Sequence, residues 1–276
     1  MKTRQLSKFY TNISILNNKY AHYLFVWEQF NIDNKGSFIN HSDELTTDLF
    51  KENKNSKQFN VKIKHLMESH ESTQNFILES LFTLSYSFFE KYIEELSKFE
   101  KSLKQEDYNK IKMERLLEEL NINTFFSNEE KVTLDYIRLR RNKIIHDAEN
   151  TQKILKDIIV RNGKKLNDYW NDELRKGRYE IDFNKQNISF FDKLEFFDLL
   201  NILRKISSKI DKLIIEKIGE KVLIKYIKKE FIEENSNKIK VLKETKIQKK
   251  FLGYCKSRYS YNIDVKILKQ LDFMME

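Results

Sequence analysis

Proline is absent from the sequence, and its 276 residues include only five glycines. These two residue types are the strongest breakers of regular helices, and most tight turns depend on them. A chain with so few of them favours long helices, and we predict an all-α fold. None of the five glycines lies in a phosphate-binding loop or a dinucleotide-binding fingerprint. The composition therefore argues against a kinase, an ATPase or a Rossmann-type enzyme.

Apolar residues recur at helical spacing along most of the chain. They predict helices over 7–30, 42–51, 61–103, 107–120, 127–149, 154–160, 167–174 and 192–233. Two loops are expected at 31–40, where Gly36 gives a turn signal, and at 51–60, which is polar enough to be a linker. Alternating apolar residues on both sides of 184–187 predict a small β-hairpin over 179–190. We expect an N-terminal helical extension (1–58), a central helical domain (59–233) and a basic helical C-terminal extension (234–276).

The helix that contains residues 135–149 has the most informative pattern. Ser127 and Glu130 form the capping-box sequence that begins a helix. The apolar stripe that follows is interrupted by Arg141, which takes the position between Ile137 and Ile145. An arginine on a buried stripe is rare unless it is paired. Glu90, among the aromatic residues of the 61–103 helix, is the expected partner, although it would equally suit an exposed helix face.

Beside this stripe, Arg138, Asn142 and His146 form a second row with a spacing of four residues. Arg140 is an alternative to Arg141, because a small distortion of the helix would exchange their positions. These residues are the candidate site. A purely structural role, in which they complete a polar contact between helices, is the competing interpretation.

Two segments resemble a known family. Arg141-Asn142-Lys143-Ile144-Ile145-His146 resembles the Arg-polar-x-x-x-His signature of the HEPN superfamily, all-α proteins many of which are metal-independent endoribonucleases. Phe88-Phe89-Glu90-Lys91-Tyr92-Ile93 is similar to a helix found in HEPN groups of prokaryotic defence systems. The resemblance covers about residues 60–230. It implies a HEPN-like bundle, a homodimer whose two motifs face one cleft, and a toxin or effector of an antiphage or toxin–antitoxin system, with a possible antitoxin or defence-system partner.

Cleavage of RNA without a metal requires a base for the 2′-hydroxyl, an acid for the leaving 5′-oxygen and a cation for the charge on phosphorus. Histidine can act as base or acid near neutrality, and arginine binds phosphate oxygens in a bidentate way. We therefore assign catalysis to Arg141, Asn142 and His146, with Glu90, Arg138 and Arg140 in support. One motif supplies one histidine, so a second copy would complete the pair. We expect RNA as substrate, a homodimer through the motif helix, and products with 2′,3′-cyclic phosphate and 5′-hydroxyl ends.

Metals, cofactors and membranes are not expected. The single cysteine, Cys255, excludes an intramolecular disulfide and a cysteine-rich zinc site. No carboxylate or Cys/His cluster near the motif has the spacing of a metal site. No signal peptide is recognised and no apolar run is long enough to cross a bilayer, which predicts a cytoplasmic protein without membrane contact.

The net charge of +9 belongs to the last third of the chain. Residues 201–276 contain 19 Lys/Arg and 10 Asp/Glu, whereas the first 200 residues contain 32 of each. A basic segment suits a nucleic-acid backbone or an acidic protein surface, but lysine-rich helices are as often only solvated. Because tyrosines alternate with basic residues here, we expect nucleic-acid binding through Lys249, Lys250, Lys256 and Arg258, although the same residues could equally pack on the bundle. The alternative function is thus a non-catalytic helical module that binds nucleic acid or a partner protein through this region.

Overall fold

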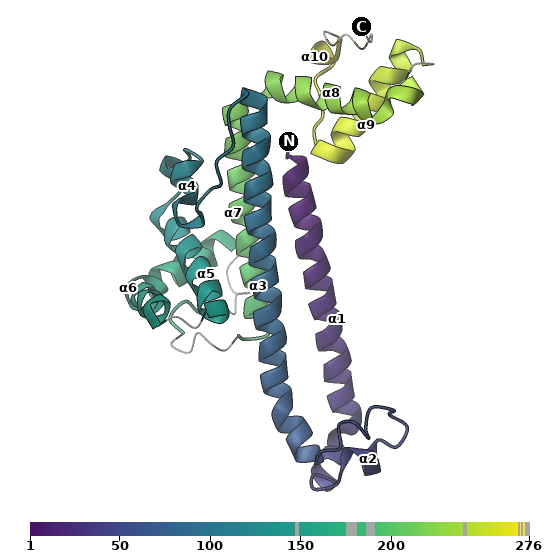
Figure 1. The fold of residues 1–276 in the computed structure, drawn as a ribbon, viewed down its shortest axis with the longest axis vertical. Coiled ribbons are helices and arrows are strands. Elements are labelled where there is room, and N and C mark those ends of the chain that lie inside the picture. The colour runs from purple at the N-terminus through teal and green to yellow at the C-terminus, as the bar shows by residue number, and fades with distance from the viewer. Residues whose placement is uncertain are drawn as a thin grey trace. The chain divides into compact units, whose positions relative to one another are not determined.

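The computed structural model describes the chain except residues 147–148, 175–180, 186–190, 240–241, 270, 272 and 274–276 and the side chains of 71, 149–150, 238, 265 and 269. Helices are its regular elements, which confirms the predicted all-α class (Figure 1). They are α1 (Arg4–Asn40), α2 (Thr46–Leu49), α3 (Ile63–Lys104), α4 (Leu116–Glu119), α5 (Asn128–His146), α6 (Glu149–Leu174), α7 (Glu195–Ile218), α8 (Glu220–Ile239), α9 (Glu244–Tyr259) and α10 (Val265–Lys269), with 3₁₀ turns η1 (Met113–Arg115) and η2 (Asn123–Phe125).

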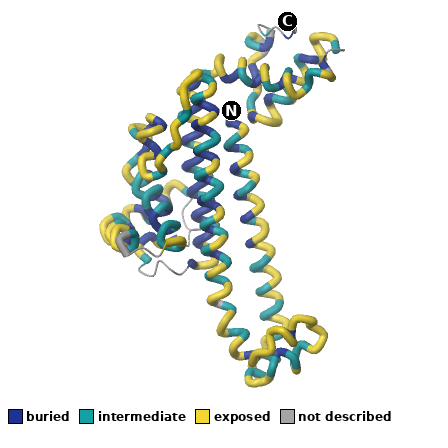
Figure 2. The backbone as a smooth tube through the Cα atoms, in the orientation of Figure 1, coloured by how far each residue is buried: buried dark blue, intermediate teal, exposed yellow. Residues whose placement is uncertain are grey.

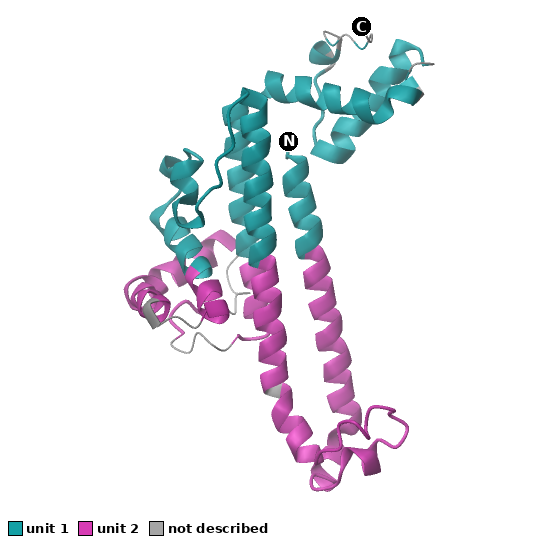
Figure 3. Cartoon of the chain, viewed as in Figure 1, with its two compact units in different colours: residues 1–13, 86–138, 201–276 teal, residues 14–85, 139–200 magenta. Residues whose placement is uncertain are grey.

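The chain divides into two compact units (Figure 3). Unit 1 contains Met1–Ile13, Tyr86–Arg138 and Asn201–Glu276, and unit 2 contains Ser14–Ser85 and Leu139–Leu200. Helices α1, α3, α5 and α7 each contribute to both units. The units are discontinuous in sequence, whereas the three segments predicted above are consecutive, and that division into segments stays a prediction.

In unit 1, aromatic rings join α1 to α3, and a hydrogen bond joins α3 to α7. Phe9 of α1 stacks on Tyr92 of α3, with ring centroids 5.4 Å apart, and packs edge-on against Phe89. The Tyr92 hydroxyl donates to the Ser207 carbonyl of α7 at 3.0 Å. Each of these helices buries one face, so buried residues recur along it at helical spacing among exposed ones (Figure 2).

The C-terminal helices also belong to unit 1. Gly219 has a φ of +84° and joins α7 to α8, a left-handed conformation that glycine adopts without steric cost. Helix α9 packs on α8 through Phe251 and Phe231, whose ring centroids are 5.3 Å apart. Cys255 and Tyr259 follow Phe251 on the same face at a spacing of four, and both are fully buried.

Unit 2 combines the rest of α1 with the first part of α3, with α6 and with the start of α7. The Trp27 ring of α1 stacks on the His70 ring of α3, with centroids 3.5 Å apart. Tyr20 of α1 packs edge-on against Phe196 at the start of α7. Trp170 of α6 is among the largest fully buried side chains of the chain.

Two predicted interruptions are wrong, because both helices continue through a glycine. Helix α1 continues past Gly36 to Asn40, where the sequence predicted a loop; Phe38 in this part packs on Phe30 and Phe50, and that packing overrides the turn signal. Helix α6 continues past Gly163. A Cβ at Gly163 would lie 2.7 Å from the Phe183 carbonyl oxygen, so this glycine admits a neighbouring segment instead of ending the helix.

The helix predicted over 107–120 is shorter in the structure. Only η1 and α4 are helical there, and Asn121, at a φ of +55°, follows them in the left-handed region. The Lys112 amide donates to the Glu119 carboxylate at 2.9 Å, which folds the preceding segment back onto this turn. In contrast, the predicted 61–103 helix is confirmed as α3.

Most of the predicted β-hairpin (179–190) lies outside the described residues. Its described part, 181–185, contains a turn, and the described chain forms no strand. The Ile181 amide donates to the Asp198 carboxylate at 3.1 Å and the Phe183 amide to the Asn167 side chain at 2.8 Å. Side-chain oxygens thus accept the backbone hydrogen bonds that a neighbouring strand would accept in a hairpin. Within the described residues, no helix has the length and apolar character needed to cross a membrane.

Candidate functional site

The N-terminus of α5 has the geometry that the sequence predicts. The Ser127 amide donates to the Glu130 carboxylate at 2.9 Å, and the Glu130 amide donates to the Ser127 hydroxyl at 3.2 Å. Two amides that the helix itself leaves without acceptors are thereby satisfied. Glu130 is buried and also receives the Lys209 ammonium of α7, with the shorter contact at 2.6 Å. The capping box therefore fixes the start of α5 against α7 inside unit 1.

The arginine buried on α5 is Arg140, and the prediction that Arg141 continues the buried stripe is wrong. The Arg140 side chain is 1% exposed and forms an ion pair with Glu195, whose side chain is equally buried. The guanidinium also lies over the Phe191 ring, 3.8 Å from its centroid. A flat guanidinium can stack on an aromatic ring while its edge binds a carboxylate, so both contacts form at once.

Glu195 is a residue of this site that the sequence analysis did not identify. Besides Arg140, its carboxylate accepts the Asp192 amide at 3.1 Å and lies 3.4 Å from the Lys185 ammonium. Asp192-x-x-Glu195 before an apolar run is a capping-box pattern, so a sequence signal was present. That signal predicts the start of α7, but it does not indicate which cation Glu195 pairs with.

The motif residues occupy the last turns of α5. Arg141 is half-buried, and its Nη1 donates to the Asn142 Oδ1 at 3.1 Å. His146 is exposed and is the last residue of the helix. Arg138, in the preceding turn, donates to Asp135 at 3.0 Å. Arg141 and Asn142 are thus in contact, and they are followed one turn later by an exposed imidazole.

Glu90 is half-buried on α3 and belongs to unit 1, whereas Arg141 belongs to unit 2. It lines a pocket of about 340 Å³ together with Tyr108 and Lys110. The pairing of Glu90 with Arg141 joins residues of the two units and stays a prediction.

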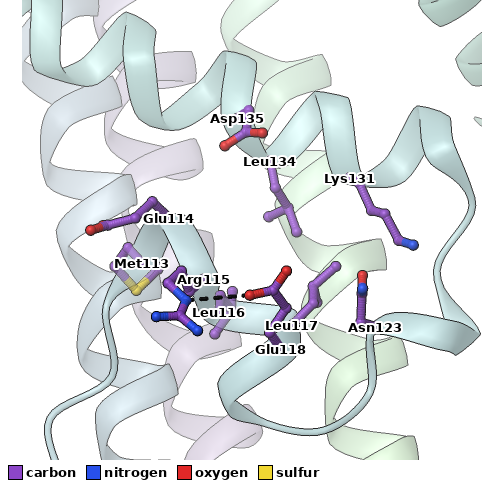
Figure 4. Close-up of a pocket in the computed structure, with 10 residues that line it drawn as sticks. All are labelled: Met113, Glu114, Arg115, Leu116, Leu117, Glu118, Asn123, Lys131, Leu134 and Asp135. Atoms are coloured by element: carbon purple, nitrogen blue, oxygen red, sulfur yellow. Dashed lines mark hydrogen bonds and ion pairs between the residues drawn. The ribbon is translucent and has the colours of Figure 1, made fainter.

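A second pocket of unit 1, of about 240 Å³, lies beside the first half of α5 (Figure 4). Leu134 and Asp135 of α5 line it opposite Arg115 and Glu118, which form an ion pair at 3.3 Å. Polar groups of both signs face this space. The residues that α5 contributes to it come from its first half, whereas His146 ends the helix, so the pocket and the motif are separate features of α5.

The basic candidates of the C-terminal region are all exposed residues of α9: Lys249, Lys250, Lys256 and Arg258. Arg258 also contacts Glu234 of α8 at 4.0 Å. The nearby tyrosines bind carboxylates of α8 instead. Tyr254 and Tyr259 both donate to the Glu230 carboxylate, and Tyr261 donates to Glu220. These three hydroxyls thus bind carboxylates of α8, and the exposed face of α9 presents charge.

Comparison with models of known protein families, with curated proteins and with solved structures gave no match. Within the described residues, His, Cys and carboxylate side chains form no group of three or more that could hold a metal ion.

Proposed function

We propose that the protein is a metal-independent endoribonuclease of the HEPN type, acting as a toxin or effector in prokaryotic antiphage defence or in a toxin–antitoxin system. The observation that carries this proposal is the arrangement on α5, where Arg141 and Asn142 are in contact and His146 is exposed one turn later. The buried Arg140–Glu195 pair lies directly before them and holds this part of the helix in place.

In the proposed reaction, the 2′-hydroxyl oxygen of RNA attacks the adjacent phosphorus and the bond to the 5′-oxygen breaks. One His146 takes the proton of the 2′-hydroxyl, and the His146 of a second copy gives a proton to the leaving 5′-oxygen. Arg141 binds the phosphate oxygens, on which negative charge grows as the nucleophile adds. Asn142 holds the arginine through its side-chain oxygen. The products carry 2′,3′-cyclic phosphate and 5′-hydroxyl ends.

The test compares wild type with His146→Ala, both as purified proteins on RNA in excess EDTA and by expression in cells followed by analysis of total RNA. We expect wild type to cleave and the variant to be inactive by at least about a hundredfold, the lower range for loss of an acid–base group. Because His146 is exposed, the melting temperature should not change. His65→Ala, which removes an exposed histidine of α3, is the matched control and should cleave like wild type.

An active His146→Ala protein would contradict the proposal, as would cleavage that EDTA abolishes and magnesium restores. The second candidate function is nucleic-acid or partner binding through the basic residues of α9, favoured by the exposure of all four. Retention of biological function when both Arg141 and His146 are replaced by alanine would select it.

A further inference from the structure

Helix α1 has two apolar stripes on opposite sides within unit 2. The inner stripe includes Tyr20 and Trp27, which pack on residues of the same unit. The outer stripe consists of Phe25, Ile32 and Ile39, whose side chains are 68%, 68% and 69% exposed. Exposed residues recur along the whole of this part of α1 (Figure 2). Since seven residues are just under two helical turns, the three outer residues lie almost on one line.

The positions between these three residues complete a heptad pattern. Residues at alternating spacings of three and four extend the outer stripe in both directions, and none of them is an Asp, Glu, Lys or Arg. They are Ile15, Asn18, His22, Phe25, Gln29, Ile32, Gly36 and Ile39. Four of the eight, Ile15, Phe25, Ile32 and Ile39, are apolar, and the set extends over more than three heptads, a length that suits a helix–helix seam. Its polar members weaken such a seam but fix its register.

No contact within its own chain requires a glycine at position 36. Glycine destabilises the interior of a helix relative to alanine, and it is normally retained where a Cβ would collide with a neighbour. A Cβ at Gly36 would meet no atom within 4 Å. On the seam, however, a missing side chain leaves room for a large residue of a second helix.

The charges beside the seam distinguish the possible directions of a second α1. Glu28 and Lys35 flank one edge, and Lys19, Val26 and Asp33 flank the other; Lys19 would lie beside an uncharged residue of the second copy in either direction. Parallel copies would place Glu28 near Asp33 of the second copy, and like charges repel. Antiparallel copies in the register that sets Phe25 against Gly36 place Glu28 beside Lys35 of the second copy, twice by symmetry. The charge pattern and the large-to-small match therefore select the same arrangement.

We infer that the outer stripe of α1 binds the same stripe of a second copy of this chain in antiparallel orientation. Phe25 of each copy lies over Gly36 of the other, and Ile32 lies near the two-fold axis. Glu28 also contacts Lys193 of its own chain at 3.1 Å, through side chains that are 59% and 50% exposed. Such exposed pairs contribute little, so this contact does not hold Glu28 away from the second copy. The seam contains no residue of α5 and is independent of the proposed cleavage site.

The first test measures molar mass by sedimentation velocity and light scattering between about 1 and 100 μM. Ile32→Glu places charges near the symmetry axis and should halve the mass of the assembly, with an unchanged helical circular dichroism signal because Ile32 is exposed. The matched control is Val160→Glu, which introduces the same charge at a 74% exposed position of α6 in the same unit and should leave the mass unchanged. Equal masses for wild type and Ile32→Glu, including two monomers, would overturn the inference.

The second test reverses the charges beside the seam. Glu28→Lys and Lys35→Glu should each weaken association by about tenfold or less, the range of exposed ion pairs, and the double variant should recover the wild-type affinity. A double variant as weak as either single variant would overturn the antiparallel pairing. RNA cleavage is measured on the same proteins. Failure of the seam appears in the molar mass, whereas failure of the proposed nuclease function appears in the activity of His146→Ala.

Discussion

Arg140 and Arg141 differ by one position in the sequence but have different surroundings. One residue corresponds to a rotation of about 100° around a helix, so only one of two neighbours can face the interior. Arg140 is paired with Glu195 and covered by Phe191, whereas Arg141 is half-buried and bonded to Asn142. Arg140 therefore stabilises the fold, whereas Arg141 belongs to the candidate site.

This division predicts unequal effects on stability. Arg140→Ala leaves Glu195 buried without its main cation and should lower the free energy of unfolding by about 3 kcal/mol, the lower end for a broken buried pair, because Lys185 still contacts Glu195. Arg141→Ala should change it by less than about 1 kcal/mol. Urea unfolding followed by circular dichroism measures both. An equal loss of stability for Arg141→Ala and Arg140→Ala would contradict the unequal roles assigned to the two arginines.

The sequence alone predicts the residue types of the candidate site but not which arginine is buried. The apolar residues alone predict a stripe through Ile137 and Ile145. The buried face of α5 instead includes the polar Thr133 and Arg140, while Ile145 is 42% exposed. Burial of Arg140 depends on Glu195, which is 55 residues away. No local pattern contains that information.

At the scale of helices, local sequence patterns predict where a helix lies better than where it ends. The capping box at Ser127 and the long apolar face of α3 are properties of consecutive residues, and both predictions are confirmed. Whether Gly36 or Gly163 ends a helix depends on packing by other segments. Gly163 lies against 183–184, a contact between residues about 20 apart that periodicity cannot reveal.

The start of α5 offers a test at this scale. Ser127→Ala removes one of the two reciprocal capping bonds and should cost about 1 kcal/mol. Glu130→Ala should cost more, because the same buried carboxylate also binds Lys209 of α7. Thermal unfolding of both variants gives the comparison. A larger loss of stability for Ser127→Ala than for Glu130→Ala would contradict a stabilising role of the Glu130–Lys209 contact between α5 and α7.

At the scale of the whole chain, residues close to the N-terminus contact residues more than 200 positions away inside unit 1. The Thr3 amide donates to Asp211 of α7 at 2.9 Å, and its hydroxyl donates to the same carboxylate. The Lys2 amide donates to the Tyr259 carbonyl of α9 at 2.9 Å. Asp211 is 1% exposed, and burial raises the pKa of its carboxyl group to about 6.

This raised pKa predicts a pH dependence with a definite sign. Protonated Asp211 is favoured in the folded state, so its contribution to stability is present below pH 4 and is lost as the pH rises through 6. The difference amounts to roughly 3 kcal/mol at most, since each pKa unit corresponds to about 1.4 kcal/mol. Wild type should therefore gain stability relative to Asp211→Asn as the pH falls from 7 to 4. Parallel stability curves for the two proteins in urea would contradict this assignment.

The environment of Cys255 has a practical consequence. Cys255 is the only cysteine of the sequence, and burial raises the pKa of its thiol to about 12. At neutral pH the thiol is therefore protonated, and it is also fully buried. Maleimides and similar reagents attack accessible thiolates. A cysteine introduced at an exposed position of either unit would accept a fluorophore or spin label while Cys255 remains unmodified. Distances between labels placed in units 1 and 2 can thus be measured in a protein that keeps its native cysteine.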